Sequence, residues 1–167
     1  MPLYLEYLLW RNPETRLSRA MFVFGINPQD PIFAMPELQT DEARAILVQP
    51  DTVFIDRLSR ADFGPQTVGL ETEASRRRVT IGGQYTLGGG FAADGTLIMS
   101  DQNFVRFFTP RSFDQINLGL IQTSEGANVQ AIADTLRKQL PADVQVMTRR
   151  DIIQNDLRYW LENTAIG

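Results

Sequence analysis

Residues 76 to 104 constrain the fold most, because strand, turn and helix signals follow one another there without interruption. The apolar residues of the first part fall on odd positions: Val79, Ile81, Tyr85 and Leu87. Such alternation is typical of a strand with one apolar face. The glycine run from Gly88 to Gly90 ends this strand, and Asp94-Gly95 is typical of a tight hairpin turn. Leu97 to Met99 then form a second, short strand.

A short helix is predicted directly after this second strand. Ser100 is a suitable N-cap, and Asp101 lies in the first turn, where negative charge is favourable. Four aromatic residues fall within and just after this helix: Phe104, Phe107, Phe108 and Phe113. We interpret them as the small core that closes a β-rich module, because a module this short needs bulky side chains. An exposed aromatic patch that binds a protein partner is the alternative.

A strand-helix-strand pattern precedes this module. Residues 20–25 form an apolar run that suits a buried strand, and Thr40 can cap a helix. Pro50-Asp51 then turns the chain, and residues 52–57 form a strand rich in β-branched and aromatic side chains.

The same order recurs after the module. Residues 116–123 favour a strand, Asn128 can cap a helix, and residues 144–147 favour a second strand after Pro141. The sequence therefore predicts an α+β fold, in which a duplicated strand-helix-strand layer carries an inserted β-rich subdomain. We expect residues 1–64 and 112–167 to form the layer and residues 65–111 to form the insertion.

Both ends of the chain carry helix signals. Leu5, Leu8 and Leu9 lie on one face of a short predicted helix over residues 2–11, which Pro13 ends. It is either a packing helix or the end of a membrane helix. Thr148 and a carboxylate three residues later form a capping box. The helix that follows, over residues 149–162, contains neither glycine nor proline, so we predict a rigid element.

Composition excludes several classes of chemistry. The chain has no histidine and no cysteine, so it has no Cys nucleophile, Cys/His zinc site or Ser-His-Asp triad. No Lys-Ser or Lys-Thr pair follows the glycines, so no P-loop is present. The formal net charge of −4 disfavours nucleic-acid binding. We therefore expect no enzyme activity, cofactor or metal, and a small hydrolase is the weakest of the functional hypotheses.

Four segments carry a resemblance to a known family. They are Met21-Phe22-Val23-Phe24-Gly25-Ile26-Asn27-Pro28, the run from Pro50 to Arg60, Arg78-Val79-Thr80-Ile81-Gly82-Gly83, and the run from Asp94 to Asp101. In the residues of these segments and in the order in which they occur, the chain resembles the extracytoplasmic domain of DevC-like permeases of ABC exporters, within the MacB and FtsX group. In MacB-like permeases the layer and the insertion are called the porter and sabre subdomains.

The resemblance implies a non-catalytic domain on the periplasmic side of the cytoplasmic membrane. Such a domain docks a periplasmic adaptor (membrane fusion) protein and transmits motion driven by a separate ATPase subunit during export. The resemblance also implies a homodimer in the full transporter, and membrane spans that flank a soluble piece on both sides. A module that binds a lipid or an amphiphile for a transport system is the alternative function.

Two clusters are the candidate partner-binding residues. The first is the glycine-rich tip: Gly88, Gly89, Gly90, Phe91, Asp94 and Gly95. An exposed loop on a scaffold often carries function, and Phe91 is its expected anchor. The second is the basic run: Arg76, Arg77 and Arg78. These arginines either grip an acidic group or form a solvated strand edge.

Overall fold

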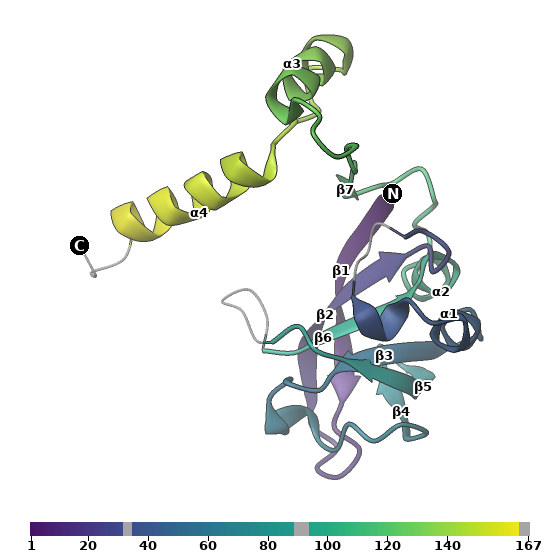
Figure 1. The fold of residues 1–167 in the computed structure, drawn as a ribbon. Coiled ribbons are helices and arrows are strands. Elements are labelled where there is room, and N and C mark those ends of the chain that lie inside the picture. The colour runs from purple at the N-terminus through teal and green to yellow at the C-terminus, as the bar shows by residue number, and fades with distance from the viewer. Residues whose placement is uncertain (32–34, 89–93, 164–167) are drawn as a thin grey trace. The chain divides into compact units, whose positions relative to one another are not determined.

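The computed structural model describes residues 1–31, 35–88 and 94–163, and the chain divides into two compact units, Met1–Ile121 and Gln122–Gly167. Figure 1 shows the elements of both. The strands are β1 (Pro2–Arg11), β2 (Ser18–Ile26), β3 (Thr52–Asp56), β4 (Glu71–Ala74), β5 (Arg77–Tyr85), β6 (Thr96–Ser100) and β7 (Leu118–Gly119). The helices are α1 (Asp41–Leu47), α2 (Asp101–Phe107), α3 (Val129–Gln139) and α4 (Arg149–Asn163), with 3₁₀ turns at Pro36–Leu38 and Ala61–Phe63.

The strands of the first unit form one sheet that closes on itself (Figure 1). Its order is β2-β6-β3-β5-β4-β1-β7, and β1 also pairs with β2 from Leu3 to Arg11. The opposite edge of β1 pairs with β4 where Trp10 faces Ala74. The β2–β6 and β3–β5 pairs are parallel, and the other pairs are antiparallel. Closure leaves the barrel formed by β1 to β6 without a long open edge, which protects it from unwanted strand pairing.

The predicted helix over residues 2–11 is wrong, because this segment is strand β1. The side chains of Tyr4, Leu8 and Trp10 are buried on one face, whereas those of Tyr7 and Leu9 are about half exposed on the other. This period of two suits a strand. The leucine spacing alone fitted a helix as well, and pairing with β2 decided between the two.

Two apolar cores lie on the two faces of the closed sheet. The inner core contains Leu8, Trp10, Met21, Val23, Val53, Ile55, Val79, Ile81, Leu97, Met99 and Phe104, among others. The outer core lies under α1, where Ala43 and Leu47 pack with Phe54, Tyr85 and Ile98. Helix α2 contributes Phe104 to the inner core, and a Cβ on Gly25 would lie only 2.6 Å from the Phe104 ring. Glycine at position 25 therefore lets this helix approach β2 closely.

The expected insertion does not separate from the rest of the first unit. Strands β4, β5 and β6 all come from residues 65–111, yet they lie in one sheet with β1, β2 and β3. The boundary between the compact units lies at Ile121, not at residues 64 and 111. Among the described residues β5 and β6 do not form a hairpin, because β3 lies between them and pairs with both. Asp94-Gly95 therefore belongs to a crossover loop, and long-range pairing decided this arrangement.

The helix signals in the second half are confirmed, but the strand signals are not. Asn128 caps α3, and its side chain accepts a hydrogen bond from the Ala131 N–H. Of residues 116–123, only β7 is a strand, and it pairs with Pro2 and Leu3 of β1. Residues 144–147 form no strand in the described structure, because no neighbouring strand supplies a hydrogen-bonding edge. The second half therefore shows no strand-helix-strand unit matching the first.

The aromatic cluster after β6 is divided between core and surface. Phe104 is fully buried, and Phe107 and Phe108 pack against the inner core. Phe113 is 49% exposed, so it does not belong to that core. The core interpretation thus holds for the three phenylalanines at α2.

Candidate functional site

The loop between β5 and β6 is held at its base by one buried carboxylate. Asp56, the last residue of β3, is 1% exposed. Its Oδ1 atom accepts hydrogen bonds from the Leu58 and Leu87 N–H groups, both at 3.1 Å. Its Oδ2 atom accepts one from the Gly88 N–H at 2.8 Å. Backbone N–H groups that converge on a carboxylate form strong, charge-assisted bonds, so Asp56 fixes the incoming stem of this loop.

The outgoing stem is held by the turn that follows Asp56. The Arg60 guanidinium contacts the Asp94 carboxylate at 2.9 Å, and the Arg60 N–H donates to the Asp94 carbonyl oxygen at 2.9 Å. A Cβ on Gly95 would lie 2.6 Å from the Phe63 ring, so only glycine fits there without a shift of its neighbours. The segment from Asp56 to Arg60 thus clamps both stems of the loop.

Two exposed leucines flank this clamp. Leu58 is 56% exposed and Leu87 is 48% exposed. A Cβ on Gly88 would lie 3.7 Å from the Cδ1 atom of Leu58, so Leu58 lies beside the loop stem. Gly88 itself has φ of +90°, a conformation that other residues adopt only with strain. We call Leu58 and Leu87 the stem leucines. They are apolar groups on a rigid base, as a protein contact requires.

The structure places only part of the predicted tip. Gly88, Asp94 and Gly95 lie on the two stems, as described above. Gly89, Gly90 and Phe91 lie outside the described residues, so the role of Phe91 as an anchor stays a prediction.

The basic run lies at the other end of β5. Ser75 and Arg76 form the tight turn between β4 and β5, both with positive φ. Arg77 begins β5 and Tyr85 ends it, so about 25 Å of strand separates this turn from the loop stems. The sequence therefore predicted two clusters that the fold does not bring together.

The arginines at that turn have partners of their own. The Arg77 guanidinium lies 5.6 Å from the centre of the Phe107 ring, over its face, and Arg78 lies 3.7 Å from Glu71. The Arg78 and Glu71 side chains are 80% and 56% exposed, so this ion pair is a surface contact of little energetic weight. The inner core beside Phe107 is filled by side chains, which counts against an amphiphile pocket there.

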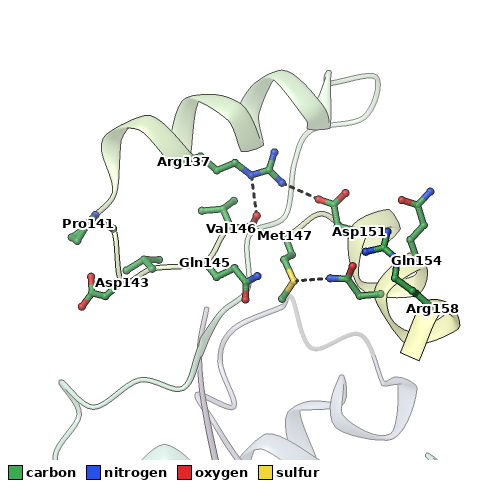
Figure 2. Close-up of a pocket in the computed structure, with 12 residues that line it drawn as sticks. Arg137, Pro141, Asp143, Gln145, Val146, Met147, Asp151, Gln154 and Arg158 are labelled. Atoms are coloured by element: carbon green, nitrogen blue, oxygen red, sulfur yellow. Dashed lines mark hydrogen bonds and ion pairs between the residues drawn. The ribbon is translucent and has the colours of Figure 1, made fainter. Parts of the chain in front are cut away.

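The second unit contains an open pocket of about 720 Å³ between α3 and the start of α4 (Figure 2). Its polar lining includes Arg137, Gln145, Asp151, Gln154, Asn155 and Arg158. Figure 2 shows Arg137 reaching from α3 toward the loop and toward Asp151. The charge of Arg137 is therefore already paired with groups of the protein itself. The residues that line the pocket include no nucleophile next to a general base.

The capping box at the start of α4 is confirmed in its geometry. The Asp151 N–H donates to the Thr148 Oγ1 at 3.1 Å, and the Thr148 N–H donates to the Asp151 Oδ2 at 2.9 Å. Hydrogen bonding of the carboxyl to the backbone N–H and to the side chain of Thr148, followed by the contact with Arg137, lowers the pKa of Asp151. Stabilisation of the ionised form accounts for the direction of this shift.

Two further features of the described residues bear on metal binding and on catalysis. In the described ranges, no three or more acidic side chains gather in a way that could hold a metal ion. Burial raises the pKa of the Tyr85 hydroxyl, whose oxygen lies 2.6 Å from the Thr96 Oγ1. This pair is a buried structural contact, because Tyr85 belongs to the outer core and Thr96 is buried as well.

Sequence reasoning missed Asp56 and the stem leucines. The available signal was an acidic residue at the end of an apolar strand, with an exposed leucine two positions later.

None of the described helices has the length and apolar character that a membrane span needs.

Comparison with known proteins shows a likeness among solved structures. Neither models of protein families nor curated proteins match this chain. Among solved structures, the periplasmic region of MacB from Actinobacillus actinomycetemcomitans matches with a TM-score of 0.56 and 15% identity. The match covers 98% of this chain and 75% of the MacB chain. The chain therefore has the fold of a MacB periplasmic region.

Proposed function

We propose that this chain is a periplasmic domain of an ABC-exporter permease, that it docks a periplasmic adaptor protein, and that it passes on ATPase-driven motion. The observation that carries this proposal is the likeness to a MacB periplasmic region along 98% of the chain. The resemblance of four sequence segments to DevC-like permeases supports the same class and favours that branch.

The clamped loop is the proposed adaptor contact. Its stems are fixed by Asp56 and Arg60, and the stem leucines offer apolar surface beside them. A rigid base lowers the conformational entropy that a loop loses on binding. Apolar side chains that become buried at the centre of an interface carry most of the binding energy. The basic turn at Arg76 to Arg78 is a second, weaker candidate, since it lies apart from the loop.

A binding assay tests the docking role. Purified adaptor of the same transport system is captured on a biosensor, and the chain is titrated over it. We expect Leu58→Ser and Leu87→Ser each to weaken binding by about tenfold, which corresponds to about 1.4 kcal/mol of binding free energy. Val48→Ser is the matched control, because Val48 is 44% exposed and lies before the opposite end of β3. Unchanged affinity in both leucine variants would remove the loop base from the interface.

Helix α4 is the proposed coupling element. It runs from Arg149 to Asn163 and contains neither glycine nor proline, so it can transmit displacement as a rigid body. In a permease that contains this domain, a flexible Gly-Ser insertion after Leu161 should uncouple export from ATP hydrolysis. Adaptor binding should survive, because the loop base precedes the insertion. Export at the unmodified rate would refute a mechanical role for α4.

The amphiphile-binding alternative makes a different prediction. It requires an apolar pocket beside Arg76 to Arg78, and the space behind Phe107 is occupied by the inner core. Titration with vesicles of anionic lipid separates the two functions. Saturable binding that the triple substitution of these arginines by glutamine abolishes would favour the alternative.

A further inference from the structure

Arg137 connects three parts of the second unit through one guanidinium group (Figure 2). Its NH1 atom donates to Asp134 on the same helix at 2.7 Å. Its Nε atom donates to the Val146 carbonyl oxygen at 3.1 Å, and its NH2 atom donates to the Asp151 Oδ2 at 2.9 Å. The donors of a guanidinium point in fixed directions within one plane. One side chain therefore links α3, the loop after it and the first turn of α4.

The Asp151 atom that receives Arg137 also belongs to the helix cap. Its Oδ2 atom accepts from the Thr148 N–H as well, and Thr148 is one of the few buried side chains of this unit. The cap fixes the rotamer of Asp151, and Arg137 binds a carboxylate that is already oriented. The ion pair is consequently attached to the backbone at the start of α4.

Apolar packing does not replace these contacts within the second unit. Among its described residues only Ala133 and Thr148 are buried. Ile152, Ile153 and Leu157 of α4 are 45%, 49% and 57% exposed. Without a core between the helices, the direction of α4 relative to α3 depends on the polar contacts across the intervening loop.

We propose that Arg137 is the positioning residue that sets the direction of α4 relative to α3. The inference rests on the proposed coupling role of α4 for its functional meaning. A single half-exposed ion pair contributes little to stability. The two charge-assisted bonds that leave α3, to the Val146 carbonyl oxygen and to Asp151, instead select one geometry among those that the loop allows. Lysine would keep the charge, but its ammonium group lacks the fixed planar arrangement of donors, so it would not reproduce the geometry.

The absence of cysteine makes the test direct, because two introduced cysteines take spin labels without further changes. Labels at Lys138→Cys on α3 and Asp156→Cys on α4 report the distance between the helices by pulsed electron paramagnetic resonance. Both positions are exposed and make none of the contacts described above. We expect one narrow distance distribution in the parent protein.

Three substitutions then separate the contacts of Arg137. Arg137→Met keeps the length of the side chain without its charge or its donors, and it should lose the narrow distribution. In Asp151→Asn the oxygen that accepts from the Thr148 N–H can still accept from Arg137, although without the charge, so the distribution should broaden less. Asp134→Ala is the matched control, since it removes an acceptor of Arg137 on α3 itself, and it should keep the distribution.

Two results would overturn the inference. One is a narrow distribution, with its maximum unmoved, in Arg137→Met. The other is loss of helix content in Arg137→Met by far-UV circular dichroism, because Arg137 would then be needed for the helices themselves. The distance measurement requires no transport. If it contradicts the role of Arg137, the coupling role of α4 is still tested independently by the Gly-Ser insertion. Normal export from that insertion would in turn leave the positioning role of Arg137 intact.

Discussion

Removal of the Asp56 carboxylate should destabilise the first unit and release the incoming stem of the loop. Three backbone N–H groups lose their acceptor in Asp56→Ala: those of Leu58, Leu87 and Gly88. At roughly 1.5 kcal/mol for each bond to a charged group, the loss would be about 4–5 kcal/mol. Leu58 and Leu87 are about half exposed, so water can reach part of this site and replace part of the bonding. We therefore expect a loss of about 3 kcal/mol.

Asp56→Asn should lie between the parent and Asp56→Ala. The amide oxygen can still accept from Leu58 and Leu87, but the NH₂ group now faces the Gly88 N–H, donor against donor. The expected loss is about 1–2 kcal/mol. The amide hydrogens of Leu87 and Gly88 should exchange faster with solvent in both variants, because the stem opens more often.

Urea denaturation measures the free energy of unfolding, with an unchanged slope as the sign of an unchanged native fold. Asp62→Asn is the matched control in the neighbouring turn. Its ion pair with Arg19 spans 3.5 Å between half-exposed side chains, so a change below about 0.5 kcal/mol is expected. A loss under about 1 kcal/mol in Asp56→Ala, or unchanged exchange at Leu87 and Gly88, would refute the clamp.

Further predictions concern packing, the cap of α4, pH and ligands. Gly25→Ala should cost about 1–3 kcal/mol in urea denaturation, because its Cβ would lie 2.6 Å from Phe104, whereas Gly119→Ala, with open space, should cost little. Thr148→Ala should lower helix content in circular dichroism, at a cost of about 1 kcal/mol to the cap; equal spectra would contradict this. Because the pKa of Asp151 is lowered in the folded protein, its ionised carboxylate stabilises the start of α4 fully above the unfolded pKa of about 4. This stabilisation is lost as the pH falls through the folded pKa. If the helicity of α4 began to fall well above the unfolded pKa of about 4, another titrating group would be responsible for the change. Calorimetry should detect no saturable ATP binding, and EDTA should leave the melting temperature unchanged; either effect would reveal a missed site.

Local signals in the sequence determined the helices of this protein. Thr40, Ser100, Asn128 and Thr148 each cap the helix expected after them. A cap joins groups only two or three residues apart, so its formation depends little on the rest of the chain. Strands β2 and β3 were also predictable, since their apolar runs are bounded by turn residues.

Gly82 lies at a shift of register between β3 and β5, which is the geometry of a β-bulge. The direction of the chain after Gly88 was not predictable, because the Asp94-Gly95 pair suits a hairpin and a longer crossover equally. Turn residues predict that the chain changes direction, but they do not predict which strands pair with each other.

Tertiary structure decided the features on which the proposed site depends. Residues 2–11 became a strand because β2 pairs with Leu3 to Arg11, and residues 144–147 stayed irregular because no strand edge faces them in the described structure. The clamp joins Asp56 to Leu87 and Gly88, thirty-one and thirty-two positions away. No local pattern encodes such a contact, since β5 comes beside β3 only when the sheet forms. Sequence periodicity and caps are properties of neighbouring residues, whereas strand pairing, burial and the site are properties of segments that meet only in the folded chain.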